Sequence, residues 1–317
     1  MSLSKAGSGT AAFTVVTPNH LAHAYSLQQS FLRHNPHSAF FTGVIGDKTH
    51  VPEAIGYSFI YLDQLNDDRI TGMTQRYNPF ELSCSLKPYF AKHILAQQPQ
   101  IDRLIYLDGD MYVFGKFEQQ TEAAITLSPH RTTHVNFLPG LDNFSAVNLL
   151  RYGVYNAGYF ELLRKPEAFR FLDWWQTLTE HHAYNNPGEH VFVDQLWLSL
   201  VHSFFDDVFI NKNAGYNVSV WNMIERKLTR TGKSYTVNGE PLIMFHYSTY
   251  NIDTPDQLLN FEHPALSFTA LPELAPVFEI YRKALLESGY EQVKQIPHPF
   301  TYTQPGKNKK WWRKLFS

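Results

Sequence analysis

The first hundred residues alternate short apolar runs with segments whose apolar residues recur at helical spacing. The apolar runs, which predict strands, cover 12–17, 39–46, 59–62 and 103–107. Helices are predicted over 21–32, ending before Asn35-Pro36, and over 86–97. Because strands that alternate with helices build a parallel sheet covered on both faces, this pattern restricts the chain to the α/β class. Ligands bind at the carboxyl ends of such strands.

The second half of the chain is less regular. Its predicted strands lie near 123–127, 155–163 and 241–246, and its predicted helices cover 166–180, 194–201 and 274–288. There is no internal repeat and no long linker, so we expect one catalytic domain over 11–265. A flexible N-terminus (1–10) precedes this domain, and a C-terminal extension (266–317) follows it.

Composition excludes several classes of protein. The chain contains no apolar run of about 20 residues, which excludes a transmembrane helix, and its N-terminus lacks the apolar core of a secretion signal. The single cysteine, Cys84, excludes a disulfide framework and a zinc site with two thiolates. These features favour a cytoplasmic protein.

Charge is distributed unevenly along the chain. From Gly306 onward there are five basic residues and no acidic ones, so the rest holds 22 basic and 29 acidic residues, a net charge of −7. An acidic body argues against nucleic-acid binding. The basic tail also contains Trp311 and Trp312, a mixture that suits the surface of an anionic membrane. A disordered, soluble tail is the alternative.

Asp108-Gly109-Asp110 directly follows the predicted strand 103–107. Carboxylates two residues apart on an extended segment point to the same side, and oxygen ligands of this kind suit Mg²⁺ or Mn²⁺. A solvated surface turn is the alternative, but the apolar run 111–114 that follows argues against it. His246, at the end of the apolar run 242–245, is a candidate third ligand, and a hydrogen-bonded core histidine is the alternative.

Seven segments resemble, in the same order, those of retaining nucleotide-sugar glycosyltransferases with the GT-A fold, and family 8 with its bacterial relatives is the group most similar. The resemblance covers roughly residues 12–262. These segments are Ser85-Leu86-Lys87-Pro88-Tyr89-Phe90, Tyr106-Leu107-Asp108-Gly109-Asp110-Met111, Leu127-Ser128-Pro129-His130, Tyr155-Asn156-Ala157-Gly158-Tyr159, Val193-Asp194-Gln195, Tyr216-Asn217-Val218 with Trp221-Asn222, and Phe245-His246-Tyr247-Ser248. The resemblance implies a Rossmann-like mixed sheet flanked by helices. The C-terminal helical extension and the basic-aromatic tail, which the residues themselves predict, follow it.

The resemblance also implies roles for individual residues. Asp108, Asp110 and His246 would hold Mn²⁺ or Mg²⁺, which bridges the two phosphates of the donor. Thr17 and Asn19 would line the nucleoside pocket, and Lys87 would contact the donor sugar or a phosphate. Asn156 and Gly158 would lie near the donor sugar, with Asp194 and Gln195 beside the reacting carbon.

The chain departs from the family at two places. Thr17 stands where the family often has Asp. After His246, Ser248-Thr249-Tyr250 replaces the usual Gly and a nearby Lys that contacts phosphate, so Tyr250 or a basic residue from elsewhere would have to substitute.

The activity implied is metal-dependent transfer of a hexose from a nucleotide-diphosphate sugar, expected to be a UDP-sugar, to a glycan or lipid-linked acceptor. Retention is favoured on resemblance, with Gln195 or Asp194 under the anomeric carbon and the leaving phosphate taking the acceptor's proton. An inverting enzyme would use Asp194 as general base. The tail would add peripheral contact with the inner face of the cell membrane.

Other interpretations of these residues remain open. Asp194 would cap a following helix, Asn156-Ala157-Gly158 would be a turn, Lys87 would begin a solvated helix, and Trp221 would be a core aromatic. A non-catalytic sugar-binding protein is the rival from another class. A nucleotidyltransferase needs a Gly-rich loop where this chain has Thr17-Pro18-Asn19-His20, and the motifs of dinucleotide-dependent oxidoreductases and serine hydrolases are missing from the sequence.

Overall fold

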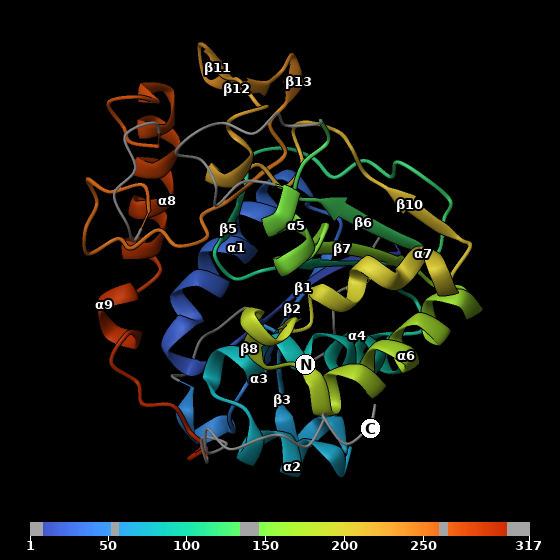
Figure 1. Ribbon diagram of the computed structural model, residues 1–317. Coiled ribbons are helices and arrows are strands. Elements are labelled where there is room, and N and C mark those ends of the chain that lie inside the picture. Colours follow the sequence, from blue (N-terminus) through green and yellow to red (C-terminus); the bar gives the residue numbers. More distant parts are fainter. Residues whose placement is uncertain (1–8, 52–56, 134–145, 260–265, 303–317) are drawn as a thin grey trace.

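A seven-stranded mixed sheet forms the centre of the protein (Figure 1). The structure, a computed structural model, describes residues 9–51, 57–133, 146–259 and 266–302. The strand order is β10-β6-β7-β4-β1-β2-β3. The strands are β1 (Thr10–Val16), β2 (Ala39–Val44), β3 (Phe59–Tyr61), β4 (Arg103–Leu107), β6 (Ile125–Pro129), β7 (Tyr155–Leu163) and β10 (Val208–Ile210). The predicted α/β class, with a mixed sheet flanked by helices, is confirmed.

Strand β7 alone in this sheet, among the described residues, runs against its neighbours. β1 pairs in parallel with β2 and β4, whereas β7 pairs antiparallel with both β4 and β6. Because of this reversal, the start of β7 lies at the carboxyl ends of β4 and β6. Residues 155–158 therefore reach the edge of the sheet where ligands bind.

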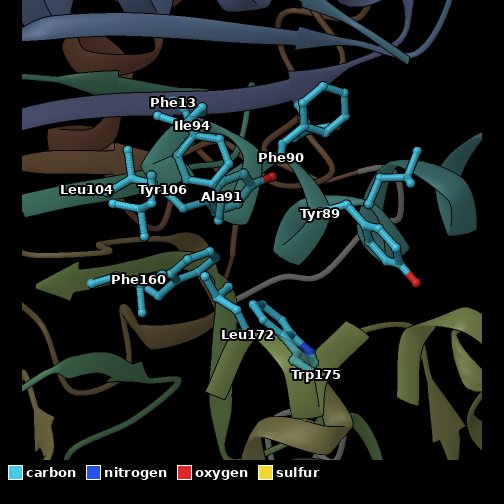
Figure 2. Packing of buried hydrophobic residues seen from close by; sticks show 14 of the residues in the cluster. Phe13, Tyr89, Phe90, Ala91, Ile94, Leu104, Tyr106, Phe160, Leu172 and Trp175 are labelled. Carbon is cyan, nitrogen blue, oxygen red and sulfur yellow. The ribbon is translucent and has the colours of Figure 1, made fainter. Parts of the chain in front are cut away.

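Helices cover both faces of the sheet, as expected. On one face, Leu27 and Phe31 of α1 (Leu21–His34) pack against Ala12 and Ile105. On the other face lie α4 (Lys87–Gln97) and α6 (Pro166–His182). Figure 2 shows this second layer, where side chains of α4 and α6 meet those of β1, β4 and β7: Phe90, Ile94, Leu172, Trp175, Phe13, Leu104 and Phe160.

Two predicted elements differ in the structure. The predicted helix 194–201 is a 3-10 turn (Leu196–Leu200) followed by the short α7 (Val201–Phe204). The predicted strand 241–246 is divided into β13 (Glu240–Pro241) and β14 (Met244–His246), which belong to different sheets. The chain crosses between these sheets at Ile243, whose amide donates to the carbonyl of Gly215 and whose carbonyl accepts from Phe114.

The remaining elements surround the central sheet. The helices are α2 (Arg69–Arg76), α3 (Pro79–Ser85), α5 (Ala146–Tyr152), α8 (Ala275–Glu287) and α9 (Tyr290–Val293). The strands are β5 (Met111–Val113), β8 (Asn185–Asn186), β9 (Val191–Phe192), β11 (Leu228–Thr231) and β12 (Ser234–Val237). Strands β11–β13 form one small sheet, β8 pairs with β9, and β5 pairs with β14.

The predicted C-terminal helix is present as α8, and it packs into the body of the protein. Its residues Val277, Phe278 and Tyr281 are buried in one cluster with Phe245 and Tyr247. The prediction of a flexible segment over 1–10 is wrong for its last two residues, because Thr10 begins β1 and the carbonyl of Gly9 accepts hydrogen bonds from Asp102 and Arg103.

The segments 1–8 and 303–317 lie outside the described residues, and with them the predicted basic tail. Within the described part of the chain, no helix has the length and apolar character needed to span a membrane.

Candidate functional site

Asp108, Asp110 and His246 converge at the carboxyl end of β4. Their ligand atoms all lie within 4.8 Å of one another. The pairing of β5 with β14 places His246 opposite Met111, directly beside Asp110. Nε2 of His246 lies 3.1 Å from Oδ1 of Asp110 and 3.9 Å from Oδ2 of Asp108. His246 is buried and hydrogen-bonded, as the alternative of a core histidine predicts, and it also lies beside both carboxylates, as a metal ligand would.

A glycine makes room for this cluster. A Cβ on Gly158 of β7 would lie 2.6 Å from Cε1 of His246 and 2.8 Å from Oδ2 of Asp108. Both separations are shorter than a Cβ atom tolerates, so a larger residue at this position would displace the two ligands. The backbone of Gly158 also accepts a hydrogen bond from the amide of Asp108, at 2.8 Å.

His246 is oriented by a buried amide. Its Nδ1 lies 3.3 Å from Oδ1 of Asn217, which leaves Nε2 directed at the carboxylates. Asn217 is fully buried, adopts the left-handed conformation with φ of 48°, and donates to Oδ1 of Asn156 at 3.1 Å. Such a hydrogen bond fixes the tautomer of a metal-binding histidine and the orientation of its ring.

The chemistry of these three residues fits a divalent cation. Two carboxylates and one imidazole are ligands that Mn²⁺ and Mg²⁺ accept. Burial lowers the pKa of His246, but the charge of Asp110, its hydrogen bond and the charge of Asp108 together raise this pKa above its ordinary value. A cation competes with a proton for His246, so binding should weaken as pH falls.

Lys87 and Asp194 form a buried ion pair beneath the cluster. Nζ of Lys87 lies 3.2 Å from Oδ2 of Asp194 and 3.2 Å from Oδ1 of Asp108, and it donates to the carbonyl of Ala157 at 3.1 Å. The side chains of Lys87 and Asp194 are 4% and 1% exposed. Lys87 is thus not the solvated start of a helix. Nor does Asp194 cap one, since the 3-10 turn that follows has no side-chain cap.

The pKa values of the two partners are both raised, for different reasons. Burial raises the pKa of Asp194 to about 6, and the nearby charge of Asp108 adds to this effect while Lys87 opposes it. Burial lowers the pKa of Lys87, but the carboxylates of Asp108 and Asp194 outweigh burial and raise it above its ordinary value. The raised pKa of Lys87 favours its charged form, whereas the carboxyl group of Asp194 has a pKa of about 6.

Asn156 and Gln195 form a hydrogen-bonded frame at the start of β7. Oε1 of Gln195 accepts from Nδ2 of Asn156 and from the amide of Ala157, both at 3.0 Å, and its Nε2 donates to the carbonyl of Tyr152 at 2.8 Å. Residues 156–158 belong to β7, so the predicted alternative of a turn is wrong. The side-chain amide of Gln195 therefore links the start of β7 to the carbonyl of Tyr152.

A cavity of about 500 Å³ opens beside these residues. Its polar lining includes Lys87, Asp108, Asp110, His130, Arg131, Asn156, Asp194, Gln195 and His246. Trp221, which is partly exposed, lines the cavity with its ring 4.9 Å from that of His246, so it is not simply a core aromatic.

Thr17 and Asn19 lie at the end of β1 and are not among the residues that line this cavity. Oγ1 of Thr17 donates to Oδ1 of Asn19 at 2.6 Å. Both residues therefore stand at the carboxyl edge of the sheet, but the structure does not bring them into the cavity with the carboxylates.

Three residues of the site have no role predicted from the sequence. Tyr106 donates to Oδ1 of Asp108 at 2.6 Å, Asn217 orients His246, and Arg131 lines the cavity. Each lies within or directly after a segment of the family resemblance, and that position is the signal that could have identified them.

Comparison with known proteins gives distant similarities. No model of a known protein family matches the chain. The chain is 24% identical over 282 residues to YfnF of Bacillus subtilis (strain 168), an uncharacterised protein, with 86% of this chain and 90% of YfnF covered.

The solved structures that are similar to the chain include two glycosyltransferases. One is the galactosyltransferase LgtC in complex with donor and acceptor sugar analogues, with a TM-score of 0.48, 14% identity, and coverage of 87% of this chain and 95% of LgtC. The other is a glycosyltransferase involved in glycosylation of the major capsid of PBCV-1, with a TM-score of 0.43, 8% identity, and coverage of 76% and 94%.

Proposed function

We propose that this chain is a metal-dependent glycosyltransferase that moves a hexose from a nucleotide-diphosphate sugar, a UDP-sugar, to a glycan or lipid-linked acceptor with retention of configuration. The observation that carries the proposal is the convergence of Asp108, Asp110 and His246, within 4.8 Å, at a cavity of about 500 Å³. Its second support is the ordered set of segments that resemble family 8.

In this proposal Asp108, Asp110 and His246 hold Mn²⁺ or Mg²⁺. The ion, when bound, acts as a Lewis acid that stabilises the charge of the departing diphosphate. Neighbouring side chains fix the position of the carboxylate of Asp108, one of the three metal-binding residues. Tyr106 and Lys87 both contact Oδ1 of Asp108, which leaves the other oxygen of this carboxylate facing His246.

The donor sugar would lie over the start of β7. Gly158 has no side chain to occupy the space, and Asn156 is fixed by Gln195 and Asn217, so its amide is a rigid contact for the sugar. Asp194 is the candidate for the group beside the reacting carbon, since it lines the cavity with its carboxylate held 3.2 Å from Nζ of Lys87. Gln195 would act by holding Asn156.

Proton transfer in a retaining reaction would need no protein base. The leaving phosphate would accept the proton of the acceptor hydroxyl as the new bond forms on the same face of the sugar. Thr17 and Asn19 would bind the nucleoside at the end of β1. The tail over 306–317 would add contact with an anionic membrane, and its deletion should then weaken binding to anionic liposomes.

A panel of nucleotide sugars tests the proposed activity. We expect one of them, in the presence of Mn²⁺, to raise the melting temperature and to be hydrolysed or transferred to an acceptor. EDTA should abolish turnover, and Mn²⁺ or Mg²⁺ should restore it. Full activity in EDTA would refute the metal assignment, and NMR detection of a product anomer opposite to that of the donor would refute retention.

Asp110→Asn provides the corresponding variant. Loss of one electrostatic stabiliser costs about 100- to 1000-fold in turnover in other enzymes, and a fall of that order is expected here. Asp173→Asn is the control, because Asp173 is an exposed acid that pairs with Lys92 on the surface.

A further inference from the structure

Four exposed apolar side chains lie on the segments that form one side of the cavity. Val147 and Leu150 are one helical turn apart on α5, and they are 65% and 74% exposed. Phe80, near the start of α3, and Tyr152, the last residue of α5, are 49% and 36% exposed and line the cavity itself. A group of exposed apolar side chains beside a cavity indicates a surface that binds an apolar ligand.

Contacts between neighbouring segments make these side chains part of one strip. The ring of Tyr152 lies 5.0 Å from that of Phe192 on β9, which also lines the cavity. β9 pairs with β8, and the amide of Asn185 on β8 donates to Oε1 of Glu81, next to Phe80, at 2.8 Å. The strip therefore runs from α5 across β9 and β8 to α3, a path that can be followed in Figure 1. We call it the apolar rim: Phe80, Val147, Leu150, Tyr152 and Phe192.

The apolar rim is connected to the part of the site that faces the reacting carbon in the proposed function. Phe192 lies two residues before Asp194, and both line the cavity. At the other end of the rim, Nε2 of Gln195 donates to the carbonyl of Tyr152 at 2.8 Å. A molecule that approaches the reacting carbon from the side of Asp194 and Gln195 therefore contacts the rim.

The chemistry of the rim favours a hydrocarbon chain over a saccharide. Aromatic rings can stack on a sugar, but the side chains of Val147 and Leu150 carry no polar atom and cannot bond its hydroxyl groups. An alkyl or isoprenoid chain needs no such partners, because its removal from water is itself favourable. Arg151, exposed between Leu150 and Tyr152, is the one charged residue of α5, and its charge suits a phosphate that links a lipid to a sugar.

We propose that the apolar rim binds the hydrocarbon part of a lipid-linked saccharide while the sugar of this molecule enters the cavity. The assignment rests on the proposed function only in calling this molecule the acceptor, and it selects the lipid-linked class among the acceptors named there. The rim gives the chain a preference for a sugar that carries a long hydrocarbon chain over the same sugar without it. Each methylene buried on the rim adds to the affinity.

A series of glucosides that differ only in chain length tests the apolar rim. Methyl, hexyl and octyl β-glucoside, each below its critical micelle concentration, are titrated into the full chain with Mn²⁺ and UDP present, and calorimetry or saturation-transfer NMR measures their affinities. Full burial of one methylene is worth about fourfold in affinity, so burial of only two predicts that octyl glucoside binds at least about tenfold more tightly than methyl glucoside. Equal affinities across the series would overturn the proposal.

Substitutions in two of the segments assign the effect to the rim. The double variant Val147→Thr/Leu150→Gln should lose most of the preference for the octyl chain, and Phe80→Ser should reduce this preference independently. Leu286→Gln is the control, because Leu286 is an exposed leucine on another helix, α8, and it should keep the full preference. Circular dichroism establishes that each variant is folded, and Phe80→Ser decides the matter if the double variant does not fold. An unchanged preference in both rim variants would place the hydrocarbon chain elsewhere and refute the assignment.

Two other occupants of the rim would give different results, and either result would show the assignment to be wrong. If the rim joins two copies of the chain, analytical ultracentrifugation will find a dimer of the wild type and a monomer of the double variant. If the rim lies on a membrane, the wild type will bind vesicles of phosphatidylcholine and the double variant will not, while the affinity for the glucosides will be independent of chain length.

Turnover separates this proposal from the proposed function. If the wild-type chain turns over no nucleotide sugar, the proposed function fails, while the glucoside affinities still decide whether the rim binds a hydrocarbon chain. If the chain transfers a sugar to methyl and octyl glucoside with equal kcat/KM, the proposed function stands, and the hydrocarbon part of the acceptor does not bind the rim.

Discussion

Nζ of Lys87 lies 3.2 Å from Oδ2 of Asp194, and both side chains are almost completely buried. Lys87 also contacts Asp108, so one cation neutralises a metal-binding carboxylate and a carboxylate of the cavity at once. Removal of one member of such a buried group leaves an uncompensated charge, which costs far more than the loss of an exposed ion pair.

Lys87→Met should therefore lower the free energy of unfolding by about 3–5 kcal/mol, which chemical denaturation measures. Lys92→Met is the matched control, because Lys92 lies on the same helix and pairs with Asp173 at the exposed surface. Its effect should stay below about 1 kcal/mol. Equal effects of the two substitutions would show that the buried pair contributes nothing special to stability.

The pH dependence of stability should report Asp194. Because the pKa of Asp194 is about 6 in the folded chain and 3.8 in its reference state, the folded state binds the proton more tightly. The stabilisation is present below about pH 4 and is lost as pH rises through about 6. Relative to Asp194→Asn, the wild type should lose on the order of 3 kcal/mol between pH 4 and pH 7. Denaturation in EDTA across this range measures the difference, and a difference that is independent of pH would contradict the assigned pKa.

Gly158→Ala should damage the metal site, because the added Cβ would overlap His246 and Asp108. We expect the affinity for Mn²⁺, followed by EPR titration, to fall at least about tenfold, as it does when the surroundings of metal ligands are disturbed. Gly188→Ala is the control, since a Cβ there meets its nearest atom only at 3.8 Å. Unchanged affinity in Gly158→Ala would mean that the three ligands do not bind the ion as a group.

Asn217→Gly removes the acceptor that orients His246 and keeps a residue that tolerates φ of 48°. Loss of such a partner typically costs about 10- to 100-fold in metal affinity, and we expect a loss in this range for Mn²⁺.

The control for Asn217→Gly is Asn238→Gly, an exposed asparagine with a similar φ of 53°. Asn217→Asp, which keeps an acceptor oxygen, should retain most of the affinity. If Asn217→Asp loses as much as Asn217→Gly, the hydrogen bond to His246 is not the cause.

Local patterns in the sequence were sufficient for much of the fold. The helices α1, α4, α6 and α8 and the strands β1, β2, β4 and β7 all lie within a few residues of their predicted ranges. The hydrophobicity of a segment and its period are properties of consecutive residues, so they can be recognised without knowledge of distant partners. The position of Asp108 and Asp110 directly after a buried strand could be predicted for the same reason, because it depends only on neighbouring residues in the sequence.

The tertiary structure alone decided how distant segments meet. The pairing of β5 with β14 brings His246 to Asp110, the reversed direction of β7 places Gly158 between these ligands, and the fold buries Lys87 against Asp194. None of these contacts has a local signature, because each depends on sheet register and packing between segments far apart in the chain. The sequence thus determined which residues had the right chemistry, and long-range strand pairing determined which of them share a site.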